Sequence, residues 1–208
     1  MSSKYTYNQG SSKSPALFAP GTEFRHNAYP ETSYFSWNLR AQGFRHAAER
    51  LIDAWPEFSI FGKNVSIYPI LFNFRMYIEL ILKDIVREDI KAVSGGGVMR
   101  GKHDLIPQWN TCCEVIRRRK LPVDHAEISR LDGYIKEFDK IDPKSQTFRY
   151  PIRPDGTLWF QQTPGPINLA NLQMVMFDIT ELLEKISNLL YADIDLENEF
   201  KCELYPEA

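Results

Sequence analysis

The sequence feature that most constrains the fold is the stretch FNFRMYIELILKDIV, residues 72–86. Its apolar side chains point in nearly every direction around a helix of 3.6 residues per turn, and a helix of that kind lies at the centre of its fold. Arg75, Glu79 and Lys83 nevertheless recur at intervals of four, which places them on one face. The stretch therefore predicts a central helix that carries one polar stripe.

The polar stripe has two interpretations. Glu79 can pair with both cations, and Glu followed four residues later by Lys is the favoured order in a helix. Each such pair contributes only about 0.2–0.5 kcal/mol on an exposed face, whereas burying an ion costs several kcal/mol. The stripe is thus either a structural ion-pair ladder, at a groove edge or inside the bundle, or one wall of a functional site.

The remaining segments predict an all-α fold, a bundle of about five helices. A helix starting at Thr32 or Ser33 ends before Pro56, and a capping box of Asp124 and Glu127 opens the fourth helix. Asp155–Gly156 between two β-prone runs predicts a short hairpin near 148–160. The other three predicted helices span about 66–90, 104–119 and 168–190.

Changes in composition divide the chain into three parts. Residues 1–30 are rich in Ser, Asn, Gly and Pro, which is typical of an irregular N-terminal arm. Residues 31–190 hold the helical periodicity and are long enough for one domain with its own core. Residues 191–208 are rich in Asp and Glu and are expected to form an acidic C-terminal tail.

Composition also narrows the class of protein. The net charge of −2 argues against a strongly basic nucleic-acid binder, although it leaves room for a local basic patch. Three cysteines, two of them adjacent, form no disulfide framework, so a reducing cytoplasm is the expected location. The sequence has no uninterrupted apolar run of about 18 residues, so no membrane span is expected. Neither metal-ligand spacing nor a phosphate-binding loop occurs, so no metal and no cofactor is expected.

The segment GKHDL, residues 101–105, contains the first candidate for chemistry outside the stripe. Asp104 is a natural N-cap for the helix that follows, and His103 directly precedes it. On one interpretation the two residues only stabilise the helix start. On the other, His103 is a titratable imidazole beside a carboxylate and is available as a general base.

The segment FRYP, residues 148–151, contains the second candidate. Tyr150 precedes Pro151 and must therefore be extended, so Arg149 projects from a fixed backbone. Arg149 could form an ion pair with Glu79 or Asp104, or its planar guanidinium could bind a phosphate.

These motifs, taken in order, resemble those of HEPN domains. ELILK in a central helix, HDL at the start of the next helix and LDGYI followed by FRYP extend the resemblance over about residues 35–190. The resemblance implies an α-helical bundle that usually forms a homodimer. Many HEPN proteins are metal-independent ribonucleases of toxin–antitoxin, abortive-infection and anti-phage systems. Others have lost catalysis and bind partners, often a nucleotidyltransferase.

The active members of that family carry Arg-x(4–6)-His, and this sequence departs from the pattern. No His follows Arg75 at that spacing, and a formal match occurs instead at Arg40 and His46 in the first predicted helix. Two hypotheses follow from the resemblance. The chain is either an RNA-directed endoribonuclease or a non-catalytic module that binds a nucleotide, a nucleotidyltransferase antitoxin or another defence-system protein.

The ribonuclease hypothesis assigns a role to each candidate residue. Arg75 and Arg149 hold the phosphate charge, and His103 moves the proton of the attacking 2′-hydroxyl. Glu79 and Asp104 orient these groups. Lys83 and Tyr150 support the site.

Overall fold

The computed structural model describes residues 25, 27–30, 36–95, 103–158 and 165–204. The chain separates into two units, Met1–Ser33 and Tyr34–Ala208, and the second holds the five α-helices found among the described residues. Most of the expected N-terminal arm lies outside the described residues. So does the expected start of the first helix at Thr32 or Ser33.

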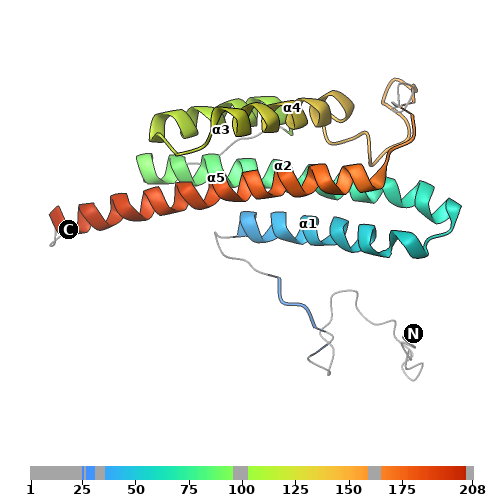
Figure 1. The fold of residues 1–208 in the computed structure, drawn as a ribbon, viewed down its shortest axis with the longest axis horizontal. Coiled ribbons are helices and arrows are strands. Elements are labelled where there is room, and N and C mark those ends of the chain that lie inside the picture. Colours follow the sequence, from blue (N-terminus) through green and yellow to red (C-terminus); the bar gives the residue numbers. More distant parts are fainter. Residues whose placement is uncertain (1–24, 26, 31–35, 96–102, 159–164, 205–208) are drawn as a thin grey trace. The chain divides into compact units, whose positions relative to one another are not determined.

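The second unit is an all-α bundle of five helices, as predicted (Figure 1). A short 3₁₀ turn follows the first helix, and Pro56 lies within it. The described residues contain no strand. The helices are α1 (Ser36–Ala54), α2 (Ile60–Ser94), α3 (Leu105–Arg119), α4 (His125–Ile141) and α5 (Leu169–Leu204), with the 3₁₀ turn η2 at Trp55–Glu57.

The hairpin expected near 148–160 is reduced to one turn. A single isolated antiparallel bridge joins Ile152 and Leu158, and Arg153 N donates to Thr157 O at 2.7 Å. Gly156 has a φ of 85°, which a residue with a side chain rarely adopts. The turn signal was therefore correct, but no ladder extends from it within the described residues.

α2 is the central helix of the bundle and contacts α1, α3 and α5. It begins at Ile60, six residues before the expected start, because Ser59 caps it: the Ser59 Oγ accepts a hydrogen bond from Gly62 N at 3.1 Å. Gly95, with a φ of 73°, ends it. Its fully buried apolar residues form the middle of the core and include Ile70, Tyr77, Ile78, Ile81, Leu82 and Ile85.

The direction of each helix follows from the long-range side-chain contacts. α1 runs antiparallel to α2, while α3 and α5 run in the same direction as α2 (Figure 1). α4 returns antiparallel to α3, and Trp109 on α3 donates to Asp132 on α4 at 3.1 Å. The capping box of Asp124 and Glu127 at the start of α4 is formed as predicted. This topology places the start of α3 beside the middle of α2.

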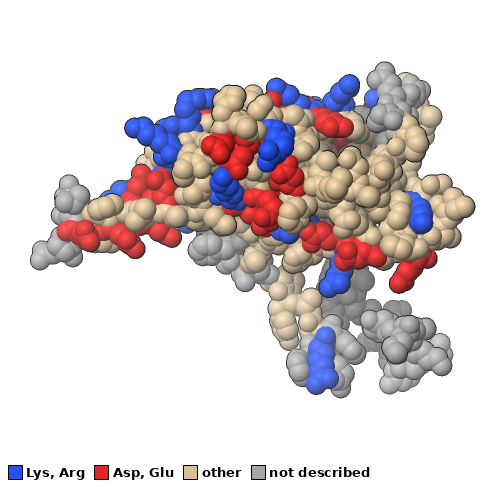
Figure 2. Space-filling view, in the orientation of Figure 1, with Lys and Arg blue, Asp and Glu red and all other residues tan. Residues whose placement is uncertain are grey.

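The segment expected as an acidic tail continues the last helix. α5 does not end at Leu190 but extends to Leu204, and Figure 2 shows acidic side chains along this part of it. Arg119 on α3 forms ion pairs with Asp193 at 2.6 Å and with Glu197 at 3.3 Å. The change in composition near residue 191 therefore marks where the helix loses burial, not where it ends.

α2 is long and apolar enough, by length and composition alone, to cross a membrane. Half of its most apolar 18-residue window is buried within the bundle, and one such helix is weak evidence of a membrane span. The structure is thus compatible with a soluble protein.

Candidate functional site

The polar stripe of α2 is buried inside the bundle. Arg75 and Glu79 are 0% and 1% exposed, and Lys83 is 7% exposed. Arg75 Nη1 lies 3.0 Å from Glu79 Oε2, and Lys83 Nζ lies 2.6 Å from Glu79 Oε1. Both ion pairs expected from the four-residue spacing are formed, and Glu79 is the carboxylate that the two cations share.

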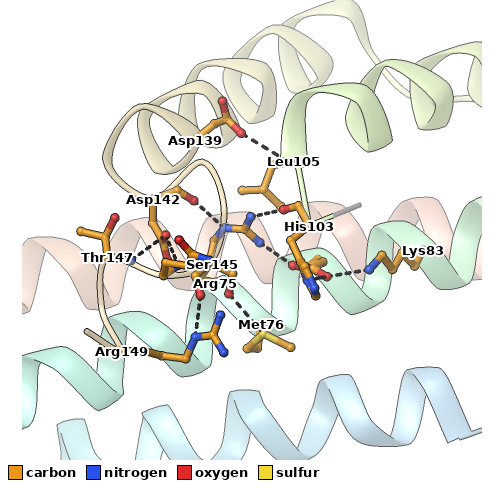
Figure 3. Close-up of polar contacts among 12 residues, drawn as sticks. Arg75, Met76, Lys83, His103, Leu105, Asp139, Asp142, Ser145, Thr147 and Arg149 are labelled. Carbon is orange, nitrogen blue, oxygen red and sulfur yellow. Dashed lines mark hydrogen bonds and ion pairs between the residues drawn. The ribbon is translucent and has the colours of Figure 1, made fainter. Parts of the chain in front are cut away.

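Arg75 also donates to main-chain carbonyl groups from two other segments. Its Nε donates to Asp142 O at 3.3 Å, and its Nη2 donates to His103 O (Figure 3). Burial lowers the pKa of Arg75, and the negative charges of Glu79 and Asp142 oppose this effect. The guanidinium therefore joins α2, the start of α3 and the end of α4, and it has no surface through which to reach a ligand.

The loop that follows α4, residues 142–149, supplies one of these carbonyl groups. Asp142 Oδ1 accepts from Gln146 N at 2.6 Å and from Thr147 N at 3.0 Å, which folds the loop back on the helix end. Thr147 Oγ1 donates to Ile141 O at 2.9 Å. Ser145, buried in the middle of the loop, has a φ of 57°, an uncommon conformation for a residue with a side chain. The loop is therefore held by its own contacts in the shape that presents Asp142 O to Arg75.

His103 is the exposed member of the cluster. Its Nδ1 lies 2.9 Å from Glu79 Oε1, while 60% of the imidazole remains exposed. An ionised carboxylate only accepts hydrogen bonds, so this contact requires the proton on Nδ1. In the neutral ring Nε2 is then an acceptor, and a buried carboxylate holds the ring in place. This arrangement suits a general base.

Asp104 differs from the prediction. It occupies the N-cap position of α3, but its side chain caps no amide of that helix and forms an ion pair with Lys144 instead. The amide of Leu105 donates to Asp139 Oδ1 on α4 at 3.3 Å. A carboxylate from the neighbouring helix has taken the capping role, because α4 ends beside the start of α3.

Arg149 does not form the expected ion pair with Glu79 or Asp104 among the described contacts. Its Nε donates to Ser145 O at 2.6 Å. Its guanidinium carbon lies 5.6 Å from the ring centre of Phe72 and 5.3 Å from that of Tyr150. Arg149 and Tyr150 are both exposed, so this stacked cation faces solvent on the loop that binds Arg75.

Arg40 and His46 lie elsewhere. Both are exposed on α1, and six residues of helix separate them by about 120° around its axis. No described contact joins them to each other or to the cluster. The structure thus brings together Arg75, Glu79, Lys83 and His103, and it leaves the formal Arg-x(5)-His match apart from them.

Sequence reasoning missed four residues of the cluster's surroundings: Asp139, Asp142, Lys144 and Ser145. The sequence IDPKS contained a signal for one of them, because Pro143 disfavours helical backbone at Asp142 and so marks the end of α4. Nothing in the local sequence indicates where the Asp142 carbonyl points.

Among the residues that the structure describes, no group of three or more His, Cys, Asp or Glu side chains could hold a metal ion. Comparisons of the chain with protein-family models, with curated proteins and with solved structures find no match. The HEPN resemblance therefore rests on the sequence motifs alone.

Proposed function

We propose that this chain is an HEPN-like, RNA-directed endoribonuclease of a toxin–antitoxin or anti-phage defence system, acting in the cytoplasm as a homodimer. The observation that supports it is the contact between His103 Nδ1 and Glu79 Oε1 at 2.9 Å. It joins a fully buried carboxylate to an imidazole that is open to solvent. A positioned imidazole of this kind is the commonest general base.

The proposed reaction needs no metal, because the nucleophile belongs to the RNA. His103 Nε2 takes the proton of a ribose 2′-hydroxyl, and the 2′-oxygen attacks the adjacent phosphorus. The bond from phosphorus to the 5′-oxygen breaks, and that oxygen takes a proton from solvent. The products are a 2′,3′-cyclic phosphate and a 5′-hydroxyl. Glu79 stabilises the imidazolium that forms.

The structural contacts revise one of the roles suggested by the sequence, that of Arg75, and leave the phosphate role with Arg149. Arg75 is fully buried and committed to Glu79 and two carbonyl groups, so it serves as a positioning residue and binds no phosphate. Arg149 is exposed on the loop beside it and is the cation that we assign to phosphate.

A second function is favoured by a different observation. The Arg75–Glu79–Lys83 ladder is satisfied within one chain, as expected for a cluster that fixes the packing of the bundle. On this proposal the chain is a non-catalytic HEPN-like module that binds a nucleotide or a partner protein, such as a nucleotidyltransferase antitoxin.

Cleavage of a mixed RNA pool by the purified full chain, in the presence of a chelator, separates the two functions. On the first proposal the parent cleaves and His103→Gln does not, although its melting temperature is close to that of the parent. His125→Gln and His46→Gln change other exposed histidines and are expected to leave cleavage intact. Equal cleavage by His103→Gln and the parent, or no cleavage by any of the proteins, refutes the first proposal and leaves the second.

A further inference from the structure

A cavity of about 370 Å³ lies between the end of α4, the start of α5 and the part of α2 around Leu71. Phe148, the residue before Arg149, also lines it. Its walls are mainly apolar and include Leu71, Phe138, Phe148, Leu172 and Val175. None of the residues that line it belongs to the cluster around Glu79. The cavity is therefore separate from the site described above.

The size of the cavity indicates what it can hold. A dry apolar cavity of about 150 Å³ accommodates a benzene ring, and sites for small ligands have volumes of about 300–1,000 Å³. An apolar body of about two rings would therefore fit.

The polar groups of the cavity indicate the ligand's charge. Glu137 is the only lining residue that carries a charge at neutral pH, and it is exposed. Among the described contacts no cation pairs with Glu137. Asn168 and Asn171 also line the cavity, but Asn168 Oδ1 accepts from Asn171 N at 3.1 Å and so caps α5. The charge that complements this lining is a single positive one.

We propose that this cavity binds a small amphipathic amine, with an apolar body of about two rings against Leu172 and Val175 and its ammonium group at Glu137. Ile141, the last residue of α4, and Phe148, which lies in the loop of residues 142–149 that binds Arg75, also line the cavity. The proposal does not depend on the ribonuclease function.

Isothermal titration of the full chain with three probes of one ring system tests the proposal: tryptamine, neutral 3-methylindole and anionic indole-3-propionate. Tryptamine is expected to bind most tightly and indole-3-propionate most weakly. Glu137→Gln should weaken tryptamine about two- to fivefold, as for the loss of a partly exposed ion pair, and leave 3-methylindole unchanged. Glu181→Gln, which changes an exposed carboxylate outside the cavity lining, is the matched control.

Val175→Trp fills the cavity and should abolish binding of both tryptamine and 3-methylindole. Because this variant could lose its fold, methyl NMR shifts of Leu172 and Val175 on titration of the parent provide an independent measurement. The proposal is overturned if tryptamine does not bind the parent at millimolar concentration, or if indole-3-propionate binds as tightly. It is also overturned if bound tryptamine shifts neither methyl resonance.

Discussion

Replacing Glu79 by Ala removes the one carboxylate that Arg75, Lys83 and His103 share. The side chains of Arg75 and Lys83 are 0% and 8% exposed, so two cations in the interior would lose the carboxylate that they share, and only Arg75 would keep a second negative charge nearby, that of Asp142. Removing one partner of a buried ion pair typically costs about 3–5 kcal/mol, because the remaining charge is desolvated and uncompensated. We expect Glu79→Ala to lower the free energy of unfolding by that amount.

Urea unfolding followed by far-ultraviolet circular dichroism measures this change directly, because the fold is helical. In a thermal scan the same loss corresponds to about 6–20 °C, at about 2–4 °C per kcal/mol for a domain of this size. Glu181→Ala is the control: Glu181 is exposed, and its replacement should change stability by no more than about 0.5 kcal/mol.

Lys83→Met provides the internal comparison. It leaves Glu79 paired with Arg75 and in contact with His103, so it should cost clearly less than Glu79→Ala. A loss below about 1 kcal/mol for Glu79→Ala, the range of exposed pairs, would refute the reasoning. So would an equal loss for Lys83→Met, since the shared carboxylate would then not be the essential member of the ladder.

Three further predictions concern other groups. Burial raises the pKa of Asp84 above its ordinary value of about 3.8, so the parent loses stability as the pH rises from that value through the raised pKa. Asp84→Asn should therefore be more stable than the parent at neutral pH. Urea unfolding at a series of pH values should show this difference in stability vanish below about pH 3.8. Asp139→Ala removes the acceptor of the first amide of α3 and should cost about 0.5–2 kcal/mol, more than Asp104→Ala, in the same unfolding assay. Cys202 is exposed, whereas burial raises the pKa of Cys113 to about 11, so mass spectrometry should find Cys202 alkylated first.

The parts of the structure that could be predicted from the sequence depend on local spacing. The periodicity of residues 72–86 placed α2 at the centre, and the four-residue spacing placed three charges on one face. The capping box at Asp124 is equally local and was also predicted correctly. In each case the partners lie within one helical turn of each other, so backbone geometry alone brings them together.

The prediction that Asp104 caps α3 was wrong, and Arg149 forms neither of the two ion pairs suggested for it, because these contacts depend on how separate segments pack. Asp104 was expected to cap α3, but α4 brings Asp139 to that amide and Lys144 to Asp104. Arg149 was expected to pair with Glu79 or Asp104 or to bind a phosphate. The turn at Ser145 directs its Nε to a nearby carbonyl group and not to either carboxylate, and phosphate binding stays a prediction. The contacts of Asp104 are set by residues more than thirty positions away, and the contact of Arg149 is set by one uncommon φ angle. Residue spacing indicates neither of them.

The choice of Arg at position 75 and Lys at position 83 follows from the same packing. Arg75 has no exposed surface, and its planar group of N–H donors reaches Glu79 and the carbonyl oxygens of His103 and Asp142 in three directions. An ammonium group is a compact point charge and could not reach all three, so Lys at position 75 would leave a buried carbonyl unpaired. Lys83 lies nearer the surface, where one contact with Glu79 is enough and water can reach its remaining donors. The stripe therefore has an arginine where three segments must be joined and a lysine where only one helical turn must be held.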